Sequence, residues 1–154
     1  MIQKTIALVA HDNKKKALLH CVKDNYQKLK NHKLICTGTT GSLVEKAIDT
    51  HHTKDDIKPL VQKLKSGPLG GDQQLGAMIS EGLIDMVIFL WDPMEPQPHD
   101  VDIKALLRLA VLYNIPTACS RSTADYILSS PLLESDYKPE AADYSNYLSR
   151  KVNA

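Results

Sequence analysis

The sequence predicts a three-layer α/β fold, in which a mainly parallel sheet of the doubly wound, flavodoxin- or Rossmann-like kind carries helices on both faces. Short apolar runs rich in branched residues alternate with stretches of helical periodicity along most of the chain. This alternation is typical of parallel strands joined by crossover helices. Residues 85–90 (DMVIFL) are apolar after the first position, as expected of a central strand covered on both faces. The chain has 154 residues, the length of one domain, so we expect a single domain over residues 1–154.

The first half of the chain predicts three strands and two helices. Residues 4–10 (KTIALVA) read as a strand that ends at the polar pair His11 and Asp12, and a helix capped by Asp12 is expected to run to about residue 30. Residues 33–36 (KLIC) predict the second strand, which leads through the glycine turn TGTTG into a helix. A partly exposed third strand is expected at residues 60–64.

The second half continues the alternation. The segment SGPLGGDQQ at residues 66–74 predicts a glycine-rich turn that leads into a helix, which Gly82 should end. After the strand at 85–90, a proline-rich loop leads to a helix with Asp100 or Asp102 near its start. The last strand is expected at 116–119. A helix capped by Ser122 or Thr123 and a weaker helix at 143–151 complete the chain.

Composition excludes several classes of function. Nineteen Lys and Arg against eighteen Asp and Glu give a net charge of +1, without the basic excess that nucleic-acid binding requires. The longest apolar run, residues 86–91, is too short to cross a membrane, and the N-terminus lacks the features of a signal peptide. We therefore expect a cytoplasmic protein with neither nucleic acid nor membrane as a partner. Cys21, Cys36 and Cys119 are expected to be reduced core residues.

Polar residues gather where the predicted strands end. His11 follows the first strand, the threonines of TGTTG follow the second, Asp72 follows the third, and Asp92 and His99 follow the fourth. The carboxyl ends of parallel strands form the ligand crevice in this class of fold. We therefore expect these loops to converge on one site.

The TGTTG segment is typical of a phosphate site, because glycines and hydroxyls at the start of a helix expose amides and the helix dipole favours an anion. It supplies Thr37, Gly38, Thr39 and Thr40. Lys15 adds a positive charge, and Ser66 and Gly67 extend the site from another loop. A threonine cap and a solvated run of lysines are the plainer interpretations. Neither the nucleotide P-loop pattern nor GxGxxG occurs.

Asp72, between two glycines and a predicted helix, is the candidate base; its plainer interpretation is a helix cap. A carboxylate and the imidazoles of His11 and His99 beside a phosphate site are the groups needed to remove a proton next to a carbonyl and stabilise the enediolate. Asp92, fixed by a proline, could orient a histidine or a substrate hydroxyl. We expect Arg108 to be an ion-pair partner first and a residue of the site second. No paired Cys/His spacing indicates a metal, so neither metal nor cofactor is expected.

Six stretches of unusual sequence carry a resemblance to a known family. They are IALVAHD at 6–12, TGTTG at 37–41, SGPLGGDQQLGA at 66–77, DMVIFLWDP at 85–93, PHDVDIKALLRLA at 98–110 and NIPTA at 114–118. In this order and spacing the chain resembles the methylglyoxal synthases over nearly its whole length. The resemblance implies conversion of dihydroxyacetone phosphate into methylglyoxal and inorganic phosphate, inhibition by phosphate, and a homohexamer.

Carried over to this sequence, the resemblance places the catalytic base on Asp72 and the substrate imidazoles on His11 and His99. The phosphate ligands fall on Lys15, Thr37, Gly38, Thr39, Thr40, Ser66 and Gly67. Supporting residues are Asp12, Gly71, Asp92, Asp102, Arg108 and Arg150. The tail departs from the family, because Lys151 stands at the position of the family's arginine and Arg150 comes one residue early.

A second hypothesis is a regulatory module that binds phosphate without performing chemistry. The presence of Asp72, His11 and His99, in a chain that ends where the domain is expected to end, favours the enzyme. Release of phosphate from dihydroxyacetone phosphate would distinguish the two.

Overall fold

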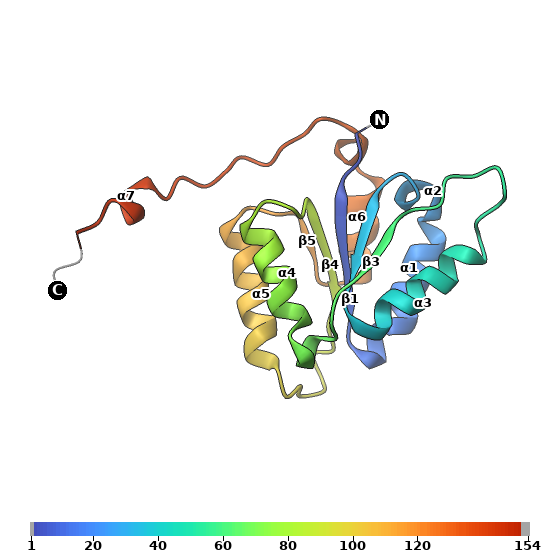
Figure 1. Cartoon of the computed structure of the whole chain (residues 1–154), viewed down its shortest axis with the longest axis horizontal. Helices are drawn as coiled ribbons and strands as arrows, with labels where there is room; N and C mark the ends of the chain where they lie inside the picture. The colour runs from blue at the N-terminus through green and yellow to red at the C-terminus, as the bar shows by residue number, and fades with distance from the viewer. Residues whose placement is uncertain (1, 152–154) are drawn as a thin grey trace.

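The computed structural model describes residues 2–151 and has a five-stranded parallel sheet with the strand order β3-β2-β1-β4-β5 (Figure 1). Its strands are β1 (Thr5–Ala10), β2 (Lys33–Cys36), β3 (Val61–Lys63), β4 (Met86–Leu90) and β5 (Thr117–Ala118). β1 lies in the middle, where Ile6 pairs with Leu34 on one side and Met86 on the other. The all-parallel sheet confirms the predicted fold class.

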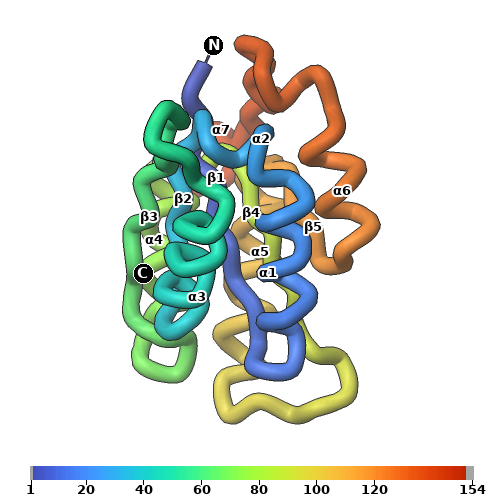
Figure 2. The backbone as a smooth tube through the Cα atoms, turned by 90° about the vertical axis from the view of Figure 1, so that its right-hand side faces the viewer, coloured from blue at the N-terminus to red at the C-terminus, as the bar shows by residue number. Residues whose placement is uncertain are grey.

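Helices cover both faces of this sheet, because successive strand residues point to opposite sides. Ile6 and Leu8 of β1 pack with α1 (Lys15–Asp24), α3 (Gly38–Asp49) and α6 (Arg121–Ser129). Ala7 and Val9 point the other way, toward α4 (Gly71–Ser80) and α5 (Asp100–Leu112). The two helical layers stand on either side of the strands in Figure 1, and Figure 2 shows α1 and α3 side by side over the first face.

The strand order places a topological switch between β1 and β4. From β1 the chain moves outward through β2 to β3, and it then crosses to β4 on the other side of β1. In open parallel sheets, loops diverge at such a point and leave a crevice outside the carboxyl ends of the strands. The fold therefore provides a site above the ends of β1 and β4.

The helix predicted from Asp12 to residue 30 is interrupted. A 3₁₀ turn, η1 (Asp12–Lys14), precedes α1, and Asn25 separates α1 from the short α2 (Tyr26–Leu29). Asn25 bonds through its side chain to the carbonyl of Cys21 at 3.0 Å, which ends the first helix. The prediction that Asp12 caps this helix was wrong: its carboxylate accepts a hydrogen bond from Lys15 instead.

Other boundaries also differ from those expected. α3 begins at Gly38, so TGTTG forms the first helical turn rather than a separate loop. α6 is capped by Ser120, whose hydroxyl accepts from the Thr123 amide, and not by Ser122 or Thr123. Asp100 and Asp102 lie in the first turn of α5, but neither forms a side-chain cap. The tail helix is limited to α7 (Ser145–Leu148).

The cysteine prediction was correct for two of three residues. Cys21 and Cys36 are free and buried, whereas Cys119 is free and exposed, because β5 ends at Ala118 and leaves it outside the core. Gly82 ends α4 as predicted, in a left-handed conformation with φ of 70°. Across residues 2–151, every helix falls short of the length and apolarity needed to cross a membrane.

The last part of the chain leaves the body of the molecule. After the 3₁₀ turn η3 (Pro131–Glu134), the backbone extends outward to α7 (Figure 1), and all residues from 141 to 151 are exposed. Hydrogen bonds from the Asn114 side chain to the Glu140 carbonyl and from the Tyr144 hydroxyl to the Leu112 carbonyl hold its beginning.

Candidate active site

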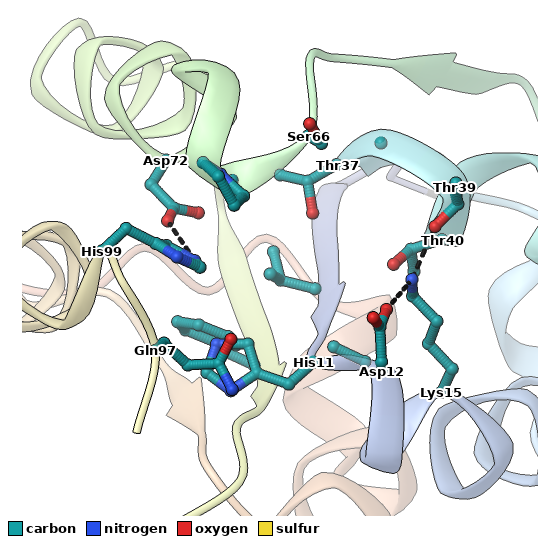
Figure 3. Close-up of a pocket in the computed structure, with 16 residues that line it drawn as sticks. His11, Asp12, Lys15, Thr37, Thr39, Thr40, Ser66, Asp72, Gln97 and His99 are labelled. Atoms are coloured by element: carbon teal, nitrogen blue, oxygen red, sulfur yellow. Dashed lines mark hydrogen bonds and ion pairs between the residues drawn. The ribbon is translucent and has the colours of Figure 1, made fainter. Parts of the chain in front are cut away.

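A cavity of about 280 Å³ opens above the carboxyl ends of the strands (Figure 3). The loops after β1, β2, β3 and β4 all contribute to its wall, so the predicted convergence of loops is confirmed. Polar residues that line it are His11, Asp12, Lys15, Thr37, Thr39, Thr40, Ser66, Asp72, Gln97 and His99. Figure 3 shows Asp72, His99 and Gln97 on one side, Lys15 and Thr39 on the other, and His11 between them.

The side with Lys15, called the anion end below, brings together groups of the kind that bind anions. The first turn of α3 directs the amides of Thr39 and Thr40, which lack acceptors within the helix, away from the helix body. Lys15 reaches over this turn and donates to the Thr39 hydroxyl at 2.5 Å while it also contacts the Asp12 carboxylate. The hydrogen bond to Lys15 lowers the pKa of Asp12, so this carboxylate stays charged. Hydroxyls, amides and an ammonium group therefore face one small volume.

Gly38 brings the two loops of this anion end together. Its φ of 44° suits glycine, and a Cβ there would lie 2.8 Å from both Cα and Cβ of Ser66. Its amide donates to the carbonyls of Lys65 and Leu64 at 3.1 and 3.3 Å. Gly38 thus sets the shape of the anion end, and its own amide is occupied by the neighbouring loop.

Asp72 is a buried carboxylate beside an imidazole. It lies in the first turn of α4, where Gly70 occupies the cap position, so the interpretation of Asp72 as the helix cap was wrong. Its Oδ2 lies 3.5 Å from Nε2 of His99, and both residues are at least nine-tenths buried. Burial raises the pKa of Asp72 above its ordinary value of 3.8, although the nearby His99 acts in the opposite direction.

His11 is held in one orientation by the backbone. Its Nδ1 accepts a hydrogen bond from the Asp92 amide at 3.0 Å, so the neutral ring carries its proton on Nε2. Burial, followed by the charge of His99, lowers the pKa of His11 and favours this neutral form. Nε2 is buried and has no hydrogen-bond partner among residues 2–151. His11 therefore presents a free N–H donor to a ligand.

Asp92 orients His11 through its main chain. The carboxylate faces elsewhere: it accepts hydrogen bonds from the Asn13 side chain and the Met94 amide, each at 3.0 Å, and these bonds lower its pKa. The Asn13 side chain was not foreseen from the sequence, where nothing distinguishes it from other polar residues at a helix start.

Two glycines allow the loop after β3 to approach Asp72 and His99. A Cβ at Gly67 would lie 2.8 Å from Nε2 of His99 and 3.0 Å from Oδ2 of Asp72. A Cβ at Gly71 would overlap the Lys65 carbonyl. Glycine at these positions leaves room for a ligand against Asp72 and lets α4 begin beneath the loop.

Five residues expected to support the site lie outside the cavity wall: Gly71, Asp92, Asp102, Arg108 and Arg150. Asp102, in the first turn of α5, acts at a distance, because its charge raises the pKa of Asp72. Arg108 lines a shallow hollow that also includes Tyr144, and Arg150 stacks on the Tyr147 ring with 3.4 Å between its Cζ and the ring centroid. Gln97, by contrast, was not predicted from the sequence and lines the cavity.

His, Cys, Asp and Glu are the side chains that most often bind metal ions in proteins. Within the described part of the chain, no three of them come together in a group that could hold a metal ion. His11 and Asp12, and likewise His99 and Asp100, are adjacent in sequence but do not form such a group.

Comparison with known proteins places this arrangement in a family. The model of the MGS-like domain matches residues 17–119. The chain is 60% identical over 154 residues to a methylglyoxal synthase of Maridesulfovibrio salexigens, covering 97% of this chain and 98% of that protein. It is 52% identical over 152 residues to a methylglyoxal synthase of Coxiella burnetii, covering 99% and 100%. The crystal structure of methylglyoxal synthase from Elizabethkingia anophelis NUHP1 matches with a TM-score of 0.86 at 52% identity, covering 98% of this chain and 93% of that one.

Proposed function

This chain belongs to the methylglyoxal synthase family, and from that premise we propose that it is a carbon–oxygen lyase that converts dihydroxyacetone phosphate into methylglyoxal and inorganic phosphate. The observation that carries the proposal is the buried Asp72 carboxylate, 3.5 Å from His99 and across one cavity from Lys15 and the first turn of α3. The reaction is an internal elimination without net oxidation or reduction, so it requires no electron acceptor.

Binding begins at the phosphate end of the substrate. The amides of Thr39 and Thr40, the hydroxyls of Thr37 and Ser66 and the Lys15 ammonium group match the oxygens of a phosphate monoester. The three-carbon part then extends toward Asp72 and the imidazoles. Inorganic phosphate fits the same end of the cavity, which supports its roles as product and as inhibitor.

Proton transfer follows at the hydroxymethyl carbon. Ionised Asp72 accepts a proton from this carbon, and its raised pKa makes it a stronger base than an exposed aspartate. The N–H of neutral His11 and that of His99 donate to the carbonyl oxygen, where negative charge develops. The product of this step is an enediolate.

Elimination depends on how the phosphate end is held. If the bridging C–O bond lies parallel to the π orbitals of the enediolate, the electron pair moves into a new C=C bond and phosphate leaves. If that bond lies in the enediolate plane, isomerisation is favoured instead. The enol released with phosphate then tautomerises to methylglyoxal. The geometry of Thr37–Thr40 relative to Asp72 therefore selects the product.

The first test is turnover by the wild-type chain and by Asp72→Asn. Chelator-treated protein is mixed with dihydroxyacetone phosphate, and phosphate and dicarbonyl are both measured. We expect Asp72→Asn to lower turnover by at least ~10²-fold, the low end for loss of a positioned base. Asp55→Asn is the matched control, because Asp55 is exposed and outside the cavity; it should keep wild-type turnover.

Two outcomes would contradict the assignment. Near-normal turnover by Asp72→Asn would remove Asp72 from the mechanism. Binding of dihydroxyacetone phosphate to the wild-type chain without release of phosphate would instead support the regulatory module.

A further inference from the structure

Gln97 lies in the loop between β4 and α5 and lines the cavity, as does His99 at the end of the same loop. Of residues 93–98, all are exposed except Gln97, which is half-buried and lines the cavity together with His11 and His99. Figure 3 shows its carboxamide on the side of the two imidazoles, away from Lys15 and Thr39. Gln97 therefore faces the end of the cavity where the carbon chain of the substrate would lie.

The backbone holds Gln97 in this position. Its amide donates to the Asp100 carboxylate and its carbonyl accepts from the Asp100 amide, both at 3.2 Å. Pro96 and Pro98 flank it and restrict the main chain on both sides. The rest of the loop is tied to η1, because the Asn13 side chain donates to the carboxylates of Asp92 and Glu95. Together these contacts hold the backbone at Gln97, and so set where its side chain starts from.

The carboxamide itself is only weakly engaged. Its Nε2 donates to the Glu95 carbonyl over 3.4 Å, a long hydrogen bond that a ligand can replace at little cost. A carboxamide both donates and accepts, and a hydroxyl group needs both kinds of partner. The other polar groups at this end have different tasks: neutral His11 offers a donor, and Asp72 is the base.

We propose that Gln97 is a positioning residue that recognises the terminal hydroxyl of the substrate. This inference rests on the proposed function and deepens it. Oε1 of Gln97 accepts a hydrogen bond from this hydroxyl, which turns the hydroxymethyl carbon toward Asp72 and selects three-carbon phosphates that carry a hydroxyl at that end. Gln97 leaves the phosphate end to the residues around Lys15 and Thr39.

The test compares three phosphate compounds in the wild-type chain and in Gln97→Leu. For dihydroxyacetone phosphate, kcat/KM should fall about tenfold, the scale of losing one buried hydrogen bond. Inhibition constants for inorganic phosphate and for acetol phosphate, which lacks the terminal hydroxyl, should stay within about twofold, because neither compound uses that bond. Gln27→Leu, the same change at an exposed position on α2, should alter none of these values.

An equal loss for dihydroxyacetone phosphate and acetol phosphate would overturn the proposal, and so would an unchanged kcat/KM. Should Gln97→Leu fail to fold, as judged by circular dichroism, Gln97→Asn serves in its place: it keeps the carboxamide but withdraws it by one carbon, and the same selective loss is expected. If the wild-type chain binds dihydroxyacetone phosphate without turnover, the proposed function fails. The proposal for Gln97 then stands if Gln97→Leu weakens binding of dihydroxyacetone phosphate but not of acetol phosphate, and it is wrong otherwise.

Discussion

Asp72 is placed where a carboxylate is costly to ionise. It is 3% exposed, its Oδ2 lacks a hydrogen-bond partner among residues 2–151, and burial raises its pKa. A carboxylate that is well solvated or fully hydrogen-bonded would be a weaker base. The features that favour proton abstraction at this residue therefore reduce the stability of the folded chain at neutral pH.

This trade-off predicts that Asp72→Asn is more stable than the wild type. Because the pKa of Asp72 is raised above 3.8 on folding, its contribution to the free energy of unfolding is full below pH 3.8 and is lost as pH rises through the folded-state value. Asparagine is uncharged throughout. At neutral pH, Tm of Asp72→Asn should exceed that of the wild type by about 2–4 °C, the shift that ~1 kcal/mol produces in a chain of this size.

Differential scanning calorimetry across pH checks this expectation. The gain in Tm should shrink as the pH falls through the raised pKa of folded Asp72 toward 3.8, because Asp72 is then protonated in the folded wild type. Asp55→Asn should show no such pH-dependent difference. A Tm of Asp72→Asn at or below that of the wild type at neutral pH would show that burial of the ionised group is compensated in the fold.

Some site residues could be predicted from residue type and place in the chain. His11, Asp72 and His99 are chemically distinctive and follow predicted strands, and the structure brings all three to one cavity. Asp92 was predicted to orient a histidine or a substrate hydroxyl, and it does contact His11. The contact is made by its main-chain amide, which any residue other than proline possesses, so the atom responsible could not be predicted. Gln97 lies among prolines in a loop, where its sequence pattern is that of an ordinary solvent-exposed turn.

Among the elements, the start of α3 depends most on a single conformation. Gly38 adopts a positive φ and lies against Ser66, so it joins two loops of the anion end. Gly82, which ends α4, also has a positive φ, of 70°, but a Cβ there would meet nothing within 4 Å. The two glycines share the backbone requirement and differ in what surrounds them.

Alanine at each position separates these two effects. Both Gly38→Ala and Gly82→Ala should lose stability by about 1–2 kcal/mol, the cost of a left-handed conformation for a residue with a Cβ. In addition, Gly38→Ala should push the Ser66 loop away and weaken phosphate binding at least ~10-fold. Urea unfolding and titration calorimetry with inorganic phosphate measure the two quantities. Equal phosphate affinity in both variants would contradict the proposal that Gly38 shapes the anion end.

Element boundaries were predicted where a single signal decides them. β2 has the predicted bounds, because a short apolar run ends at a change to hydroxyl and glycine residues. The break at Asn25 was missed, because Tyr26 and Leu29 continue the apolar spacing of α1 and are buried beside it. The cap of α6 was assigned to the wrong residue, since several cap-forming residues stand next to one another in that segment. For α4 a cap was only the alternative interpretation of Asp72, and Gly70 holds that position.

For the whole molecule, alternation of strands and helices predicted a parallel sheet but not its order. The order β3-β2-β1-β4-β5 depends on which strands pair, and no local pattern in the sequence records that choice. The convergence of loops nevertheless followed from the fold class, since the carboxyl ends of parallel strands share one edge.

The C-terminal tail exposes large apolar side chains that could pack against another copy of the chain. Tyr144, Tyr147 and Leu148 are exposed on a segment that extends away from the body (Figure 1). The family resemblance implies a homohexamer, and burial of these side chains against another copy of the chain would support it. We expect sedimentation equilibrium to give a hexamer for the wild type. The double variant Tyr147→Ser, Leu148→Ser should shift the distribution to smaller species, whereas Tyr126→Ser, on α6, should not.

Because of the switch in strand order, the two helical layers contribute different residues to the cavity. The layer with α1 and α3 supplies Lys15 and the threonines of the proposed phosphate site, and the opposite layer with α4 and α5 supplies Asp72 and His99. The two sets meet only across the cavity. If the proposed function holds, replacement of Asp72 and His99 alone should therefore turn this chain from an enzyme into a phosphate-binding module.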